Sequence, residues 1–339
     1  MRRKIKKETL LILKKVKDTI SHYGMLEKGE RVLAAVSGGA DSVSLFHVLL
    51  ALRSDLGVDL VIANLDHGVR GRESAAESRF VKSLAEDLNV KCILGKLGSM
   101  KLVSKKMSLE EKLRKKRYEF LVKAARETGC NVIATGHNMD DQAETLLMRM
   151  IKGSSAEGLG GIPPLRFEGN IKLIRPLIRT SRKEIIMYLS EIGGEYVKDS
   201  SNDDTRFLRN RVRRDILPLL EEINPAIKPT LANIADSVRE ETVFSRSLRE
   251  EKTSGFLSSR GGIHCVGLKQ YLAQPSAVRR EIFKELFVLS GGNVKKLSYR
   301  HWMLLDAFAR TQSKGRSLDL PGKVNVVKSK GKLTFGMSR

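Results

Sequence analysis

One stretch of the chain combines small, hydroxyl and acidic residues in a pattern that can hold a phosphate chain. Residues 34–42 read AAVSGGADS and lie where an apolar run, expected to be a strand, changes to a segment of helical period. Adjacent glycines let the backbone approach a phosphate, and the amides of the first helical turn point toward it. Neither the Walker A spacing nor the GxGxxG turn is present. The predicted phosphate-binding residues are Ser37, Gly38, Gly39, Ala40, Asp41 and Ser42.

A second candidate is the string GHNMDDQAET at residues 136–145. His137 ends a predicted strand, and Asp141 and Glu144 are three residues apart on the following helix, so their side chains share one face. Two carboxylates at a strand end can hold a substrate ammonium group. The alternative is that they are ordinary acids favoured by the helix dipole, which fits Asp140 and Asp141 better than Glu144.

Basic residues mark three further positions. His67 and Arg70 follow the second predicted strand at its carboxyl end, where doubly wound sheets bind ligands. Residues 101–117 include eight Lys and Arg, and residues 206–214 include five Arg. Arginine binds phosphates or stacks on unpaired bases, although such a run is often only a solvated helix face. The candidate RNA contacts are Arg114, Arg117, Arg206, Arg209, Arg211 and Arg213.

An alternation of strands and helices is expected to position these residues. Between residues 31 and 135, short apolar runs alternate with helical segments at 42–56, 74–88, 109–127 and 139–151. This rhythm predicts an α/β fold, a Rossmann-like parallel sheet with helices on both faces. A basic amphipathic helix is expected within residues 1–28.

The pattern changes near Pro218. Helices are expected at 226–251, 276–289 and 299–311, followed by apolar runs that begin at residues 317, 323 and 332. We therefore predict a catalytic domain at residues 1–218 and, at residues 219–339, a mainly helical, basic domain that ends in a small β element. Three prolines between 218 and 229 make this boundary broad.

Composition favours a nucleic acid as partner. The 339 residues include 62 Lys and Arg against 39 Asp and Glu, a net charge of +23, while 41% hydrophobic residues provide a sizeable core. The longest nearly apolar run, residues 43–52, is too short to span a membrane, and the N-terminus lacks the features of a secretory signal. We expect a cytoplasmic protein that does not bind membranes. Three isolated cysteines predict neither a disulfide nor a CxxC site.

The string SGGADS resembles the signature of the PP-loop ATP pyrophosphatases, which cleave ATP to AMP and pyrophosphate. This resemblance implies that the loop binds ATP and that Asp41 lies near a Mg²⁺ ion, which phosphate and carboxylate oxygens also suit on general grounds. Strings at 64–74, 108–118, 134–153 and 199–213 are similar to the tRNA(Ile)-lysidine synthetases, so the likeness covers residues 31–218.

That family converts the wobble cytidine of tRNA(Ile) with a CAU anticodon to lysidine, using ATP and free L-lysine. The resemblance implies catalytic roles for Asp41, His137, Asp141 and Glu144, with Asp141 and Glu144 binding lysine. It adds His67, Arg70 and Gly136 to the ATP-binding residues, and it implies tRNA contacts by the six arginines named above. We also expect the basic domain at residues 219–339 to contact the tRNA.

Three other functions remain open. A tRNA thiolase of the same fold needs paired thiols or an iron-sulfur site, and an amide synthetase fed by glutamine needs an ammonia-producing domain. A non-catalytic RNA-binding scaffold would not need the SGGADS string. Oligomeric state is open, including a homodimer, as is contact with the acceptor stem, because longer family members have a further C-terminal domain.

Overall fold

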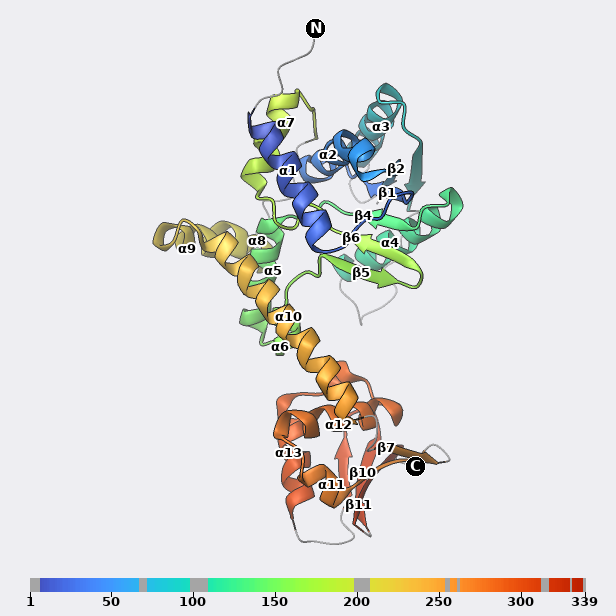
Figure 1. Ribbon diagram of the computed structural model, residues 1–339, viewed down its shortest axis with the longest axis vertical. Helices are drawn as coiled ribbons and strands as arrows, with labels where there is room; N and C mark the ends of the chain where they lie inside the picture. The colour runs from blue at the N-terminus through green and yellow to red at the C-terminus, as the bar shows by residue number, and fades with distance from the viewer. Residues whose placement is uncertain are drawn as a thin grey trace. The chain divides into compact units, whose positions relative to one another are not determined.

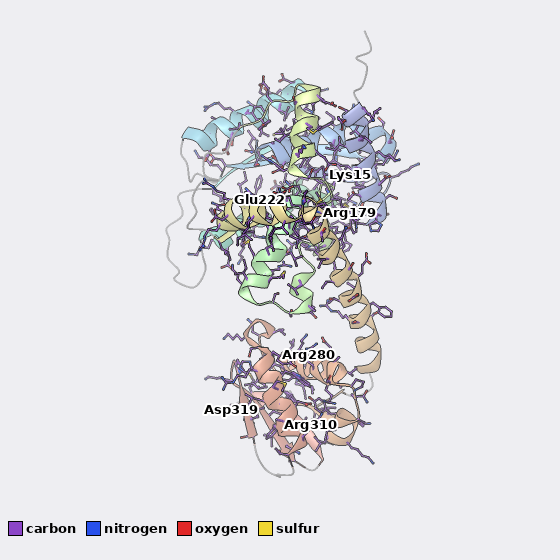
Figure 2. All side chains as sticks on the ribbon, turned by 90° about the vertical axis from the view of Figure 1, so that its left-hand side faces the viewer. Lys15, Arg179, Glu222, Arg280, Arg310 and Asp319 are labelled. Carbon is purple, nitrogen blue, oxygen red and sulfur yellow. The ribbon has the colours of Figure 1, made fainter. Side chains whose placement is uncertain are left out.

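The computed structural model divides the chain into two compact units, Met1–Arg239 and Glu240–Arg339. It describes residues 7–66, 72–97, 109–197, 208–253, 257–260, 263–311, 317–329 and 331–337. Charged side chains occur on both units: Lys15, Arg179 and Glu222 belong to the first, and Arg280, Arg310 and Asp319 to the second (Figure 2). Within the described residues, no helix is long and apolar enough to cross a membrane.

The first unit is built on a six-stranded sheet with the order β3-β2-β1-β4-β6-β5 (Figure 1). Its strands are β1 (Arg31–Ala35), β2 (Asp59–Asp66), β3 (Cys92–Lys96), β4 (Val132–Ala134), β5 (Leu165–Glu168) and β6 (Ile171–Ile174). All neighbours pair in parallel except β5, which runs antiparallel to β6 at the edge. The strand order turns between β1 and β4, and such a switch point is where doubly wound sheets bind ligands.

Helices cover both faces of this sheet. One face packs against α1 (Lys7–His22), α2 (Ala40–Leu56), α3 (Arg72–Asp87) and α7 (Arg182–Ile192), and the other against α4 (Leu109–Thr128). Along β1, Val32 and Ala34 belong to the first core and Leu33 to the second, because successive strand side chains point to opposite faces. The predicted α/β architecture is confirmed.

A further apolar cluster joins α5 (Met139–Lys152) to later elements. It contains Ala143 and Leu146 of α5 together with Val212, Leu217, Leu231 and Ala235. The partner residues come from the π-helical turn η2 (Val212–Ile216), α9 (Leu217–Ile223) and α10 (Ile227–Thr253), while the short helices α6 (Ala156–Leu159) and α8 (Leu208–Arg211) flank them. The arginine-rich segment is thereby packed against the helix of the acidic pair.

The division between the units lies later than the predicted boundary at residue 218. The first half of α10 belongs to the first unit, where Asp236 accepts hydrogen bonds from the Tyr23 hydroxyl at 2.8 Å and from Arg179 at 2.7 Å. Two of the three prolines that suggested a boundary lie in first turns of helices, a position that tolerates proline: Pro218 in α9 and Pro229 in α10. Pro225 lies in the turn between these helices.

The second unit combines helices with a five-stranded antiparallel sheet of order β7-β8-β11-β10-β9. Its elements are β7 (Leu257–Arg260), β8 (Ile263–Gly267), α11 (Leu268–Leu272), α12 (Ser276–Leu289), η3 (Val294–Lys296), α13 (Tyr299–Arg310), β9 (Ser317–Leu320), β10 (Val324–Ser329) and β11 (Lys332–Met337). The core includes Phe283, Phe287 and Trp302. The predicted helices α12 and α13 are present, but β7 and β8 enlarge the sheet beyond the predicted small β element.

Candidate active site

The predicted phosphate loop connects β1 to α2. Gly38 has a φ of +97°, a conformation that favours glycine. The Ser42 hydroxyl donates to the Gly39 carbonyl at 2.9 Å and accepts from the Ser37 amide at 3.1 Å. Ser42 therefore shapes the loop from within, whereas Ser37 is exposed. The free amides of α2 begin at Ala40 directly after the loop, as anion-binding helix N-termini require.

A buried amide side chain holds the loop from the neighbouring strand. Asn64 Nδ2 donates to the Val36 carbonyl at 2.8 Å, and the Ser78 hydroxyl donates to Asn64 Oδ1 at 2.8 Å. Asn64 had no predicted role, although a polar residue within the apolar run of a strand is a signal that could have identified it.

Gly136, predicted to bind ATP, lets the end of β4 approach α2. A Cβ atom at Gly136 would lie 3.0 Å from the backbone carbonyl of Asp41 and 3.0 Å from the Ser42 nitrogen. Backbone atoms cannot give way as a flexible side chain can. A larger residue would therefore have to push apart the carboxyl end of β4 and the first turn of α2, which favours glycine at this position.

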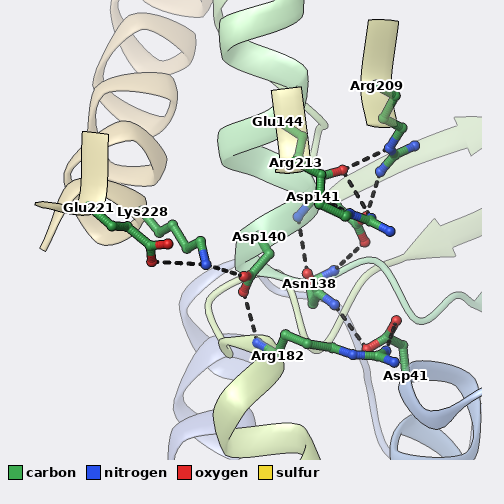
Figure 3. Close-up of polar contacts among 10 residues, drawn as sticks. All are labelled: Asp41, Asn138, Asp140, Asp141, Glu144, Arg182, Arg209, Arg213, Glu221 and Lys228. Atoms are coloured by element: carbon green, nitrogen blue, oxygen red, sulfur yellow. Dashed lines mark hydrogen bonds and ion pairs between the residues drawn. The ribbon is translucent and has the colours of Figure 1, made fainter. Parts of the chain in front are cut away.

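The Asp41 carboxylate is bound on both oxygens (Figure 3). Oδ1 accepts from Asn138 Nδ2 at 3.0 Å, and Oδ2 forms an ion pair with Arg182. Burial raises the pKa of Asp41, and the Arg182 guanidinium opposes this rise. No group of three or more His, Cys, Asp and Glu side chains in the described ranges could hold a metal. One carboxylate beside a phosphate loop nevertheless suits Mg²⁺, which is commonly bound by one or two carboxylates plus substrate phosphates.

Asn138 connects Asp41 to the acidic pair. It caps α5: its side-chain Oδ1 accepts a hydrogen bond from the Asp141 backbone amide at 3.0 Å, and its backbone amide donates to Asp141 Oδ2 at 3.0 Å. Only 3% of Asn138 is exposed. This residue also had no predicted role, although an Asn immediately before a helical segment is a typical N-cap signal.

The adjacent acid, Asp140, has a different environment. It accepts from the Arg182 amide at 2.8 Å and from Lys228 at 2.9 Å, and Lys228 also pairs with Glu221 at 2.9 Å (Figure 3). Asp140 thereby ties α5 to α7 and α10. This arrangement supports a structural role for Asp140.

Two arginines bind the carboxylates of Asp141 and Glu144 (Figure 3). Arg209 Nε donates to Glu144 at 2.8 Å, and its Nη2 donates to Asp141 at 2.5 Å. Arg213 donates to Glu144 from Nε at 2.6 Å and from Nη2 at 3.1 Å. The Glu144 side chain is only 1% exposed, so it requires such partners. The predicted acidic pair and two of the predicted RNA-contact arginines, Arg209 and Arg213, therefore lie in direct contact.

His137 lies beside this cluster at the end of β4. Its Nδ1 is 2.9 Å from the Thr135 hydroxyl. Burial lowers the pKa of His137 well below 6.5, and nearby positive charges, from Arg175 first and then Arg209, lower it further. The imidazole is therefore neutral near pH 7.

The remaining predicted residues lie in three places. Arg114 and Arg117 are on α4, where the Arg114 guanidinium carbon is 5.7 Å from the centroid of the Tyr118 ring. Arg211 pairs with Asp215 at 3.9 Å, and 66% of its side chain is exposed. Three candidates, His67, Arg70 and Arg206, lie outside the described residues.

Known proteins resemble this chain in sequence and in fold. A family model described as a PP-loop domain matches residues 8–220. The fold is similar to that of the U34-tRNA thiolase of Methanococcus maripaludis, with a TM-score of 0.59, 22% identity, and coverage of 69% of this chain and 79% of that one.

Two curated relatives carry the name tRNA(Ile)-lysidine synthase. The protein from Geobacter sulfurreducens is 33% identical over 327 residues, which cover 96% of this chain and 69% of the relative. The protein from Symbiobacterium thermophilum is 42% identical over 241 residues, which cover 71% of this chain and 50% of the relative. With the PP-loop at the switch point and relatives of this identity, the chain belongs to the tRNA(Ile)-lysidine synthase family.

Proposed function

We propose that this chain converts the wobble cytidine of tRNA(Ile) with anticodon CAU to lysidine, with ATP and free lysine as substrates. One observation carries the proposal. Asn138 hydrogen bonds to Asp41 at the phosphate loop and to Asp141 of the acidic pair, so the two candidate subsites adjoin at one sheet edge. An adenylated base can form at the first subsite and meet an amine held at the second.

The first step activates the base. The C2 oxygen of cytosine forms a bond to the α-phosphorus of ATP, and the bond to the β-phosphate oxygen breaks, releasing pyrophosphate. The loop amides and Ser37 would bind the phosphates, with Mg²⁺ held by Asp41. A Mg²⁺ ion there would neutralise phosphate charge and make pyrophosphate a better leaving group. The base must leave the anticodon stack, which costs little in a single-stranded loop.

The second step forms the carbon-nitrogen bond. The lysine ε-nitrogen attacks C2, the C2–O bond breaks, and the oxygen leaves with AMP. Asp141 and Glu144 would position the ammonium group. The amine must lose a proton before it attacks, and His137 is the candidate acceptor because it lies beside the acidic pair and is neutral near pH 7. Its lowered pKa makes it a weak base, so any proton that it accepts must pass on quickly. We also propose that the protein acts in the cytoplasm, because its proposed substrates are tRNA and ATP.

The cysteines do not favour the thiolase alternative. Burial raises the pKa of Cys92 to about 11 and raises that of Cys130, so both remain thiols at neutral pH. Cys92 lies in β3, Cys130 precedes β4, and Cys265 lies in β8 of the other unit. The similarity to the thiolase therefore extends to the fold alone.

ATP–pyrophosphate exchange tests the activation step. We expect exchange with unmodified tRNA(Ile) transcript and little exchange without RNA, because the nucleophile is a base of that RNA. A non-catalytic scaffold gives no exchange in either case. That result, with intact ATP binding, would overturn the proposed function.

A further inference from the structure

A groove of about 580 Å³ runs between α4 and the edge strand β5 (Figure 1). Its lining includes Tyr118 and Val122 of α4 and Arg166 of β5. Tyr118 and Val122 also pack on the apolar core beneath α4, which fixes their positions. Arg114 lines the groove as well. The pKa of His137 is lowered by burial and also by the positive charge of Arg114, so the groove begins close to the candidate active site.

Two arginine side chains lie over the aromatic ring that lines this groove. The guanidinium carbon of Arg166 is 4.8 Å from the centroid of the Tyr118 ring, and that of Arg114 is 5.7 Å from it. Both distances are within the range of cation–π attraction. The Arg166 side chain is 36% exposed, so its guanidinium group is accessible from solvent. A planar guanidinium group held on an aromatic ring offers a surface on which a further planar ring can stack.

The surroundings of Tyr118 carry an excess of positive charge. Arg175 is only 1% exposed and donates to the Pro163 carbonyl, and among the described residues neither Arg175 nor Arg114 forms an ion pair. The pKa of Arg175 is lowered to about 10, chiefly by burial; a hydrogen bond with Tyr118 opposes this shift, and the charges of Arg166 and Arg114 add to it. A buried guanidinium group without a carboxylate is costly, so this region favours an incoming anion such as phosphate.

We propose that the groove between α4 and β5 binds an unpaired base of the anticodon loop beside the reacting cytidine, with the base stacked on the Arg166 guanidinium group and its phosphate facing Arg114. This inference rests on the proposed function for the identity of the RNA. An inorganic anion needs no stacking surface, and an uncharged aromatic molecule needs no excess of positive charge, whereas a nucleotide of single-stranded RNA uses both. A base held in this groove keeps the loop unstacked while the cytidine reacts.

Binding of unmodified tRNA(Ile) to the full chain, without ATP or lysine, tests the proposal. Each unpaired nucleotide of the anticodon loop except the reacting cytidine is replaced in turn by an abasic nucleotide, which keeps the phosphate and lacks the ring. We expect one replacement to weaken binding to the wild type by about tenfold, a usual contribution of one stacked base. The same replacement should have no effect on Arg166→Ala, which has already lost the stacking surface. Additive losses, or no sensitive position in the wild type, overturn the proposal.

A conservative variant separates stacking from charge. Arg166→Lys keeps the charge but not the plane, so it should bind tRNA(Ile) as weakly as Arg166→Ala while it keeps the wild-type dependence on salt. Lys123→Ala is the matched control, since it removes a positive charge from an exposed side chain of α4 outside the groove and should respond to the abasic nucleotide as the wild type does.

The outcomes distinguish this proposal from the proposed function. Wild-type affinity in folded Arg166→Lys overturns the stacking contact and leaves lysidine formation intact. Weaker ATP binding with unchanged RNA binding in the Arg166 variants would assign the groove to a free nucleotide, which also overturns the proposal. If Arg166→Ala does not fold, Arg166→Lys and the abasic series in the wild type decide. Failure of the wild type to bind tRNA(Ile) contradicts the proposed function as well.

Discussion

The Asp41 carboxylate lies between the phosphate loop and Asn138, and it forms an ion pair with Arg182. We predict that Asp41→Asn keeps the fold but abolishes pyrophosphate release, because the loop amides alone cannot position metal-bound phosphates. Pyrophosphate release at saturating Mg²⁺ measures the effect, and a thermal melt checks folding. Near-normal turnover of the variant would remove Asp41 from the proposed metal site.

Glu144→Gln or Asp141→Asn should impair lysine use more than adenylation. Loss of a charge-assisted hydrogen bond costs about 1.5–3 kcal/mol, so the KM for lysine should rise roughly tenfold to a hundredfold. Asp140→Asn is the matched control, since its carboxylate contacts Lys228 and the Arg182 amide instead. If lysine dependence is unchanged and only ATP binding weakens, these acids belong to the metal site.

His137 should make the fold sensitive to mild acid. Its folded-state pKa lies well below 6.5, so below that pH the unfolded chain takes up a proton that the folded chain does not. Stability is therefore lost as pH falls below about 6.5, by up to about 1.4 kcal/mol per pH unit. Urea unfolding at about pH 7.5 and about pH 5.5, one on each side of this value, should show a smaller difference in unfolding free energy in His137→Asn than in wild type. Equal differences contradict the assigned pKa.

Residue types and spacing predicted the acidic pair but not its partners. Asp141 and Glu144 are neighbours on one helix, so local periodicity reveals them. Arg209 and Arg213 reach them from a distant part of the sequence, and such long-range ion pairing leaves no local pattern. For the same reason Arg182, which meets Asp41 through the packing of α7 on α2, was not foreseen.

At the scale of elements, the contact of β4 with α2 sets the geometry of the phosphate loop. Gly136→Ala should weaken ATP binding and destabilise the fold by about 1–3 kcal/mol, because the new Cβ meets backbone atoms of α2. Gly336→Ala in β11 is the control, because a Cβ there has nothing within 4 Å. Calorimetry and an ATP titration measure both effects. Equal behaviour of the two variants would show that β4 and α2 separate without cost.

Elements with a clear apolar pattern were predictable, and elements without one were not. The helix expected at 139–151 is α5, Met139–Lys152, because its apolar stripe and N-cap are both visible in the sequence. Strand β7 has the sequence LSSR and, among the described residues, pairs with β8 alone, so neither length nor alternation marked it. Proline by itself does not mark a domain boundary, because it also occurs in first turns of helices, as Pro218 and Pro229 do here.

At the scale of the whole molecule, a net charge of +23 should make tRNA binding strongly salt-dependent. Each phosphate contact removed lowers the slope of log affinity against log salt by somewhat under one unit, so Arg209→Ala with Arg213→Ala should flatten it by roughly one to two. ATP binding should persist. Titration of labelled tRNA at several salt concentrations measures the slope, and an unchanged slope in the folded double variant would refute an RNA role for these arginines.

Not every basic residue of the C-terminal domain can contribute to the salt dependence of tRNA binding. Lys328 is 8% exposed, and its ammonium group donates to the Ala309 carbonyl at 2.7 Å, close to the end of α13. Its charge therefore stabilises a helix end within the second unit. Exposed lysines and arginines of this region remain the predicted additional contacts.

We propose that residues at one edge of the sheet catalyse the reaction of an adenylated cytosine with lysine. The most direct measurement incubates the protein with unmodified tRNA(Ile) of anticodon CAU, ATP and labelled lysine, then digests the RNA and separates its nucleosides. We predict that the label appears in a single nucleoside derived from the wobble cytidine, that it depends on ATP, and that one AMP is formed for each lysine incorporated. RNA that carries no label, although the protein binds both tRNA and ATP, would contradict the account.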